Sequence, residues 1–183
     1  RERYLKLLNE NSKYLLQLIE DIIDISIIDS QQIKLACKHT DLSILLNKLY
    51  VNFRQILDDM DKHQIKLSLE IPEERLVTET DEVRLEQVLR NILFNSVKFT
   101  HRGEIKFGYR LIKDKLYFFV SDTGIGIKNK HLKEIFNRFM KIEDENYRVV
   151  FRGAGIGLSL CKDLVRLLGG TIWAESKYGE GSV

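Results

Sequence analysis

The sequence predicts an α+β fold, in which a mixed sheet is covered by helices on one face and follows a separate bundle-forming helix. Apolar residues with helical spacing alternate with period-two apolar patterns along residues 41–183. Some of the period-two segments follow each other as a hairpin and others are separated by helices, which favours a sheet rich in antiparallel pairs. A chain of 183 residues is long enough to bury one core of this kind.

The first segment has the spacing of a coiled-coil or bundle seam, three and four residues in alternation. The seam residues are Leu5, Leu8, Ser12, Leu15, Ile19, Ile22 and Ser26. Further apolar residues lie off the seam, more than one partner face would cover, so we expect residues 4–29 to form a homodimer. The alternative is an ordinary helix that packs on its own domain.

Three regions follow from this reading: a helix over residues 1–30, a polar linker over 31–40 and a second domain over 41–183. Asp41 is a suitable N-cap for a helix with an apolar face that runs from Leu42 to Leu57. Residues 65–71 then alternate with period two up to Pro72, which predicts a strand.

A second helix is predicted to start at Asp81. Its expected core face consists of Leu85, Val88, Leu89, Ile92, Ser96 and Phe99. Two strands, 104–112 and 116–121, follow as a hairpin with a tight turn at residues 113–115. We further expect a short helix over 130–139, a loop over 140–152, an apolar helix from about residue 158 to the Gly169-Gly170 stop, and a strand over 171–176.

Polar residues on the second helix indicate a nucleotide site. Asn91, Asn95 and Lys98 are spaced by four and three residues and therefore project from one helix face. Amide oxygens suit Mg²⁺, and an ammonium group suits phosphate. Two glycine loops, residues 122–127 and 153–158, come later in the chain, and the second opens a helix whose first turn offers unpaired N–H groups to an anion. The combination predicts ATP and Mg²⁺ as ligands.

The carboxylate of Asp122, at a predicted strand end, is a good acceptor for the exocyclic amine of adenine. A basic loop that includes Arg138, Lys141, Arg148 and Arg152 could close over the phosphates, or could simply be a solvated connector. Each glycine loop alone is weak support, because glycine pairs mark turns in many proteins.

Charge and cysteine content restrict the partners and the cellular compartment that we expect. The 29 basic and 27 acidic residues nearly cancel, so charge gives no reason to expect nucleic acid or a membrane surface as a partner. Cys37 and Cys161 fall inside apolar patterns, which is typical of reduced core thiols in the cytosol. Without an apolar run of transmembrane length, we expect a cytoplasmic domain whose parent protein is anchored in the inner membrane by segments outside these residues.

Residues 84–100 resemble the N box of sensor histidine kinases, and residues 122–127 resemble their first glycine box. Residues 135–139 are similar to the F box, 153–158 to the second glycine box and 179–182 to the last one. The first 30 residues resemble the second helix of the family's dimerisation and histidine-phosphotransfer hairpin. The resemblance implies a Bergerat-type α/β sandwich over residues 41–183, cut short at its C-terminal end.

The resemblance also implies roles for single residues. Asn95 would be a Mg²⁺ ligand, assisted by Asn91, and both would act in catalysis together with the phosphate-binding Lys98. The expected nucleotide contacts are Asn95, Lys98, Asp122, Gly124, Gly126, Ile127, Arg138, Phe139, Lys141, Gly153, Gly155, Gly157, Leu158 and Ser182. Related ATP-hydrolysing enzymes carry a glutamate at the position of Asn91, and an amide cannot replace that glutamate as a general base.

The implied activity is transfer of the γ-phosphoryl group of ATP to a histidine in two-component signalling, with a response regulator receiver domain as partner. The acceptor is expected outside this chain, because His39, His63, His101 and His131 lie in no such helical context. The alternatives are a module that binds nucleotide and dimerises without transfer, and an ATP-hydrolysing clamp.

Overall fold

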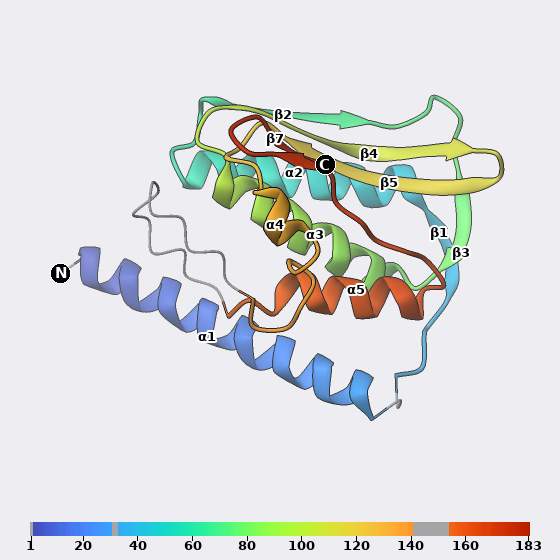
Figure 1. Ribbon diagram of the computed structural model, residues 1–183, viewed down its shortest axis with the longest axis horizontal. Coiled ribbons are helices and arrows are strands. Elements are labelled where there is room, and N and C mark those ends of the chain that lie inside the picture. Colours follow the sequence, from blue (N-terminus) through green and yellow to red (C-terminus); the bar gives the residue numbers. More distant parts are fainter. Residues whose placement is uncertain (1, 31–32, 141–153) are drawn as a thin grey trace.

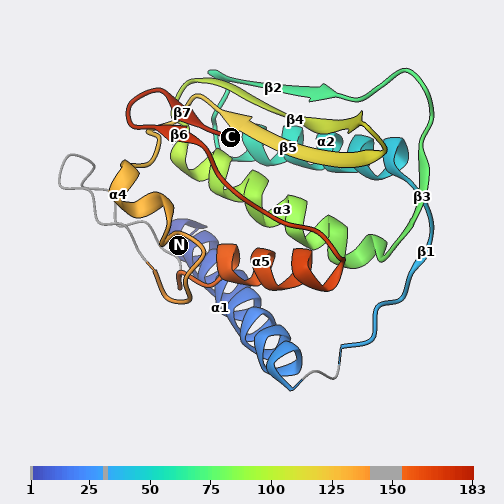
Figure 2. The same ribbon diagram turned by 45° about the vertical axis from the view of Figure 1, so that its right-hand side comes forward.

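The computed structural model describes residues 2–30, 33–140 and 154–183, with side chains omitted at 2–11, 13 and 14. Its elements form layers (Figures 1 and 2): the sheet lies on α2 and α3, α5 lies beneath α3, and α1 crosses below α5. The helices are α1 (Glu2–Asp29), α2 (Leu42–Asp59), α3 (Glu82–Phe99), α4 (Asn129–Leu132) and α5 (Gly157–Leu167). The strands are β1 (Lys38–Asp41), β2 (Ile65–Glu70), β3 (Val77–Thr80), β4 (Gly103–Ile112), β5 (Lys115–Asp122), β6 (Ser176–Lys177) and β7 (Gly181–Ser182).

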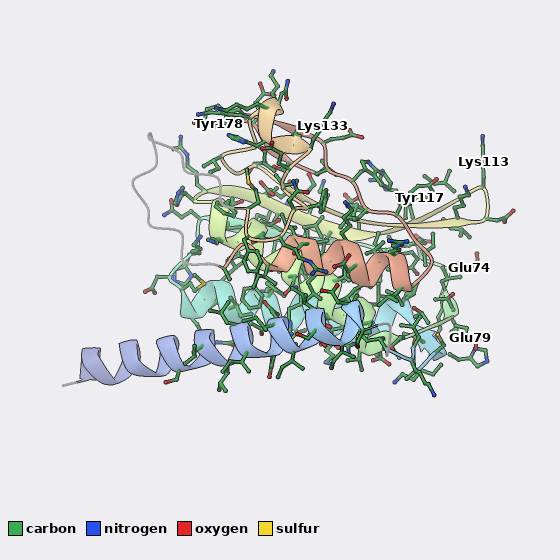
Figure 3. The ribbon with its side chains drawn as sticks, turned by 60° about the horizontal axis from the view of Figure 1, so that its bottom comes forward. Glu74, Glu79, Lys113, Tyr117, Lys133 and Tyr178 are labelled. Carbon is green, nitrogen blue, oxygen red and sulfur yellow. The ribbon has the colours of Figure 1, made fainter. Side chains whose placement is uncertain are left out.

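The main sheet has the strand order β2-β4-β5-β7-β6. β2 pairs with β4 in parallel, across the crossover that contains α3, while the remaining pairs are antiparallel. The β4–β5 hairpin turns at Lys113 and Asp114, whose φ angles of 48° and 63° fit the left-handed two-residue turn that matches strand twist. Lys113 marks its tip in Figure 3. The predicted mixed sheet with helices on one face is confirmed.

Amphipathic patterning places α2 and α3 against the sheet. Asp41 caps α2 by accepting the backbone N–H groups of Ser43 and Ile44, as predicted, and Asp81 caps α3 through Arg84 N–H. Leu93 and Val97 are almost completely buried in α3, whereas Ile92 and Phe99, predicted for its core face, are only partly buried. The difference arises because α3 is covered by the sheet on one side and by α5 on the other, so that its buried surface exceeds one stripe.

Several predicted boundaries need correction. Residues 38–40, predicted as linker, form β1, which pairs with β3; four residues are too few for a period-two signal. The strand predicted over 171–176 is limited to Ser176–Lys177, and the helix predicted over 130–139 to Asn129–Leu132. Cys37, predicted as a core thiol, is exposed, whereas Cys161 is buried as predicted.

Helix α1 has two faces. One face packs on the rest of the chain: Ile25 and Ile28 contact the cluster of Val88, Leu160, Cys161 and Leu164, while Asp24 accepts hydrogen bonds from Arg84 (2.9 Å) and Gln87 (2.7 Å). The described seam residues point elsewhere and are all exposed: Ser12, Leu15, Ile19, Ile22 and Ser26. One face of α1 therefore packs on its own chain, as the alternative reading expects, and the homodimer stays a prediction for the face that is left uncovered.

Candidate nucleotide-binding site

Of the three polar residues predicted on one face of α3, Asn91 lies opposite the start of α5, Asn95 is half-buried, and Lys98 places its Nζ atom 4.8 Å from the centre of the Phe99 ring. A Cβ atom placed on Gly157, the first residue of α5, would have the Asn91 Nδ2 atom as its nearest neighbour, at 3.9 Å. α5 begins without a side-chain cap at Ile156, so the N–H groups of its first turn are not satisfied by a capping side chain. The positive end of the α5 dipole and the Asn91 amide therefore face one another, as a site for phosphate oxygens requires.

Asn91 itself has unused hydrogen-bonding capacity. Its Nδ2 atom is buried and has no hydrogen-bond partner among the described residues. The neighbouring Cys161 thiol is directed at the Val88 carbonyl oxygen (3.7 Å), and burial raises its pKa to about 12. A buried N–H donor without a partner is costly, so this position fits a hydrogen-bond acceptor such as a phosphate oxygen.

At the other end of the site, Asp122 closes β5. Its Oδ1 atom accepts the Gly124 N–H (2.9 Å), and its Oδ2 atom accepts the Ser96 hydroxyl (3.2 Å). Burial raises the pKa of this carboxyl, an effect that the bonds from Gly124, Ser96 and the Ser182 backbone partly offset. A partly buried carboxylate is a strong hydrogen-bond acceptor for an amine of a ligand.

Close backbone approach explains two of the glycines around Asp122. A Cβ atom on Gly124 would lie 2.6 Å from the Phe99 carbonyl oxygen and 2.8 Å from Asp122 Oδ1. Gly126 has φ +65°, and a Cβ atom there would meet the Lys177 carbonyl oxygen at 2.2 Å. Any side chain at either position would displace the backbone that surrounds Asp122.

A serine pair joins the first and last glycine boxes. Ser176 Oγ accepts the Ile127 N–H (2.7 Å) and lies 2.9 Å from Ser182 Oγ, while Ser182 pairs with Asp122 across β5 and β7. The structure thus brings Asp122, Ile127 and Ser182 together, although 60 residue positions separate the first from the last in sequence.

Arg138 is placed differently from the phosphate contact that the sequence suggests. Its guanidinium binds Asp29 of α1 through two bonds of 2.6 and 2.7 Å, and also Asp163 of α5 at 3.1 Å. These carboxylates raise the pKa of Arg138, and the pKa of Asp29 is correspondingly lowered. In this structure Arg138 therefore links α1 to α5, and its contact with phosphate stays a prediction.

Phe139 is 69% exposed and donates its N–H to the Gly155 carbonyl oxygen (2.9 Å). Gly155 has φ +73°, which favours glycine, and a Cβ atom there would also lie 2.6 Å from the Met140 carbonyl oxygen. Leu158 lies in the first turn of α5. Lys141 and Gly153 lie outside the described residues, as do Arg148 and Arg152.

The sequence analysis missed two residues of the site. Ser96 was assigned only to the core face of α3, and Ser176 only to a strand end, yet their hydroxyls bind Asp122 and the Ile127 N–H. A hydroxyl on an otherwise apolar buried face was the available signal for Ser96, because buried polar groups need partners. Nothing comparable marks Ser176.

Comparison with known proteins identifies the family of the chain. The chain belongs to the family of histidine kinase-, DNA gyrase B- and HSP90-like ATPases, whose model matches residues 80–183. It is similar to the circadian input-output histidine kinase CikA of Synechococcus elongatus, with 36% identity over 183 residues that cover 100% of this chain and 24% of the relative. The predicted resemblance to sensor histidine kinases is thereby confirmed.

Solved structures share the fold. Full-length ShkA in complex with AMPPNP is 25% identical, with a TM-score of 0.81 over 100% of this chain and 37% of that one. Histidine kinase ThkA in complex with the response regulator protein TrrA is 24% identical, with a TM-score of 0.71 over 97% of this chain and 48% of that one. The predicted Bergerat-type fold and an ATP-binding catalytic domain of the histidine kinase type are confirmed. Among the described residues, no helix is long and apolar enough to cross a membrane.

Proposed function

We propose that this site transfers the γ-phosphoryl group of ATP to a histidine side chain and does not hydrolyse ATP. The observation that carries the proposal is Asn91, which stands on α3 opposite the start of α5. An amide cannot take a proton from water, so the described face of α3 offers groups that bind and orient a triphosphate without activating a hydrolytic water. The sequence relatives, which are named histidine kinases, support the same reaction.

Mg²⁺ is proposed as the companion ion. Within the described part of the chain, no three His, Cys, Asp or Glu side chains gather as a metal site. The amide oxygens of Asn95 and Asn91, with phosphate and water oxygens, would supply the hard ligands that Mg²⁺ prefers. Bound there, the ion would neutralise charge on the phosphates, while Lys98 and the α5 N–H groups would orient them.

The proposed transfer can be tested with γ-labelled ATP and Mg²⁺, with a histidine-bearing hairpin from a related kinase supplied as a separate protein. We expect acid-labile label on the hairpin and none on this chain, whose His39, His63, His101 and His131 lie on β1, on turns and in α4, away from α1. Asn95→Ala should lower transfer by at least about tenfold, the scale expected for loss of a metal ligand.

The outcomes separate the alternatives. Label on this chain would show that one of its own histidines is an acceptor. Steady phosphate release would favour a hydrolysing clamp, and nucleotide binding without transfer to any supplied hairpin would favour the transfer-inactive signalling module. If Asn95→Ala weakens ATP binding equally with and without Mg²⁺, Asn95 is not a ligand of the metal.

The uncovered seam of α1 leads to a second proposal, a homodimer formed through this helix. Leu15, Ile19 and Ile22 are 58%, 46% and 52% exposed, an apolar stripe that an isolated helix in water would not favour. We expect dimers in light scattering at high concentration, and monomers for the Ile19→Glu/Ile22→Glu variant with unchanged helix content. An unmodified chain that stays monomeric while α1 is ordered would contradict the homodimer.

Two further expectations stay predictions: a response regulator receiver domain as partner, and a cytoplasmic location.

A further inference from the structure

The last carbonyl groups of α3 have unusual partners. A helix leaves its final carbonyls without intrahelical donors, and most helices satisfy them with a glycine turn or water. Here the Lys62 ammonium bridges two of them, with hydrogen bonds to the Val97 carbonyl oxygen and, at 2.9 Å, to the Thr100 carbonyl oxygen. The Phe99 carbonyl oxygen between them accepts the Ile125 N–H (3.2 Å).

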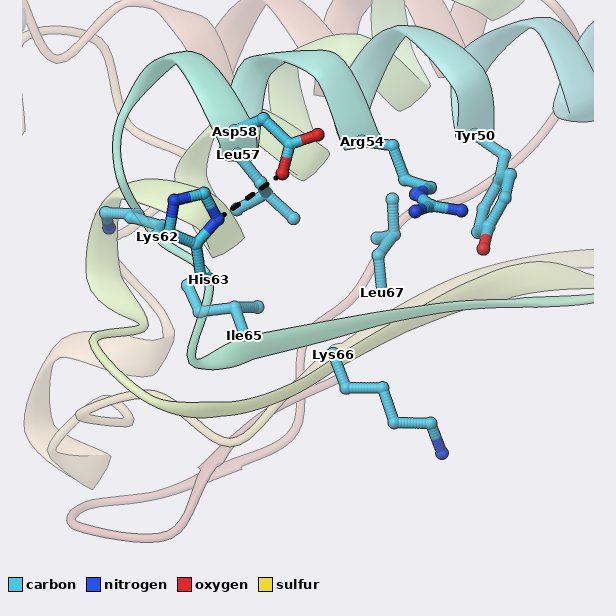
Figure 4. A pocket seen from close by; sticks show the side chains of 9 residues that line it. All are labelled: Tyr50, Arg54, Leu57, Asp58, Lys62, His63, Ile65, Lys66 and Leu67. Carbon is cyan, nitrogen blue, oxygen red and sulfur yellow. Dashed lines mark ion pairs between the residues drawn. The ribbon is translucent and has the colours of Figure 1, made fainter.

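Lys62 reaches α3 from the turn that links α2 to β2. Asp61 has φ 53°, a left-handed conformation that is uncommon for a residue other than glycine, and the Lys62 N–H donates to the Leu57 carbonyl oxygen (2.9 Å). This turn fixes where the Lys62 side chain starts. Figure 4 shows that side chain pointing away from Arg54 and Tyr50, which line the groove of about 250 Å³ between α2 and β2.

The bridged carbonyls flank Lys98, the residue assigned to phosphate. Val97 and Thr100 stand on either side of the Lys98-Phe99 pair, so a cation that holds both carbonyls fixes the backbone from which the Lys98 side chain projects. The cation also lies at the negative end of the α3 dipole, where a positive charge is favoured. On the adenine side the same turn has a bond that does not involve Lys62, from the Ile125 N–H to the Phe99 carbonyl oxygen.

We propose that Lys62 is a positioning residue for phosphate recognition, because it holds the C-terminal turn of α3 in the place from which Lys98 reaches the nucleotide. The role rests on the proposed nucleotide site and adds a residue that lies outside every motif of that site. Burial lowers the pKa of Lys62, which is consistent with an ammonium held against neutral carbonyls.

The test is a double-mutant cycle on ATP affinity in the presence of Mg²⁺, with the unmodified chain, Lys62→Met, Lys98→Met and the double variant. We expect Lys62→Met to weaken ATP binding by about three- to tenfold, less than the full worth of hydrogen bonds to a charged group, because the loss reaches ATP only through Lys98. In the Lys98→Met background the same change should have less than about a twofold effect, because it acts through Lys98. Adenosine, which has no phosphate, should bind both Lys62 forms equally.

Lys66→Met is the matched control. Lys66 also belongs to the rim of this groove, but its side chain points to the other side of β2 and pairs with Glu104 (3.3 Å). It should leave ATP affinity within about twofold, as expected for an exposed ion pair. Melting temperatures and circular dichroism identify variants that fail to fold. If Lys62→Met is one of them, Lys62→Gln replaces it in the cycle, with a smaller loss expected and the same dependence on Lys98.

Three results would overturn the role of Lys62. The first is an equal loss of ATP affinity with and without Lys98, the second is an equal loss of adenosine affinity, and the third is no loss of affinity at all. So would a loss of the same size in Lys66→Met, which would indicate a general charge effect. An unmodified chain that binds no ATP would refute the proposed function and this inference together. If the unmodified chain binds ATP, but Lys62→Met and Lys98→Met weaken that binding independently of each other, only the inference about Lys62 is refuted.

Discussion

The Asp122→Asn variant is expected to bind ATP at least about tenfold more weakly than the unmodified chain, a loss of about 1.4 kcal/mol or more. In the proposed site this carboxylate is the acceptor for the adenine amine, and it is held by bonds from Gly124 and Ser96. Asparagine keeps the shape and one acceptor oxygen but removes the charge, and charge-assisted bonds are roughly twice as strong as neutral ones. Isothermal titration with a non-hydrolysable ATP analogue measures the difference.

The same substitution should not weaken the fold at neutral pH. Burial raises the pKa of Asp122, so the native state binds this proton more readily than the unfolded state does. The charged carboxylate therefore costs stability in full above the native-state pKa, and that cost shrinks as the pH falls and is gone below the unfolded-state pKa. We expect Asp122→Asn to unfold at the same denaturant concentration or a higher one.

Asp114→Asn, in the turn before β5, is the control for a lost carboxylate outside the site. Its ATP affinity should match that of the unmodified chain. Unchanged affinity in Asp122→Asn would reject the adenine role, and weaker binding that comes with a clear loss of stability would point to misfolding as its cause.

Gly181→Ala is expected to lower the free energy of unfolding by more than Gly179→Ala, a second glycine substitution in the same glycine box. Gly181 has φ +117°, and a Cβ atom there would lie 1.9 Å from the Asp122 carbonyl oxygen. The backbone term alone costs of order 1–3 kcal/mol for a residue with a side chain. The overlap with β5 adds about 1–3 kcal/mol more, as in overpacked cores. Because relief of the overlap moves Asp122, ATP affinity should fall as well.

Gly179→Ala separates these two costs. Gly179 has φ +87°, yet a Cβ atom there would meet nothing within 4 Å. Chemical unfolding should show that it loses only the backbone term and keeps its ATP affinity. Equal free energies of unfolding for the two alanine variants would show that the contact between β7 and Asp122 is not under steric constraint.

Local patterns in the sequence were sufficient to predict most helices and the central hairpin. Asp41 and Asp81 predicted the starts of α2 and α3 because capping depends only on a side chain and the backbone two or three residues away. The glycine boxes predicted a nucleotide site for a similar reason, since backbone approach to a ligand restricts a position to glycine. Boundaries failed at β1, where four paired residues are too few to leave a pattern, and over 171–176, where the pattern of a strand is present but only Ser176 is part of one.

The sequence by itself determined the helices, the main hairpin, the polar line of Asn91, Asn95 and Lys98, and the class of ligand, because each depends on spacing along one element or loop. Only the tertiary structure decided that Arg138 binds Asp29 and Asp163, that Ser96 supports Asp122 and that Lys62 bridges the end of α3. These contacts join elements distant in sequence, and their partners are set by how the helices pack on the sheet. No local spacing encodes that packing.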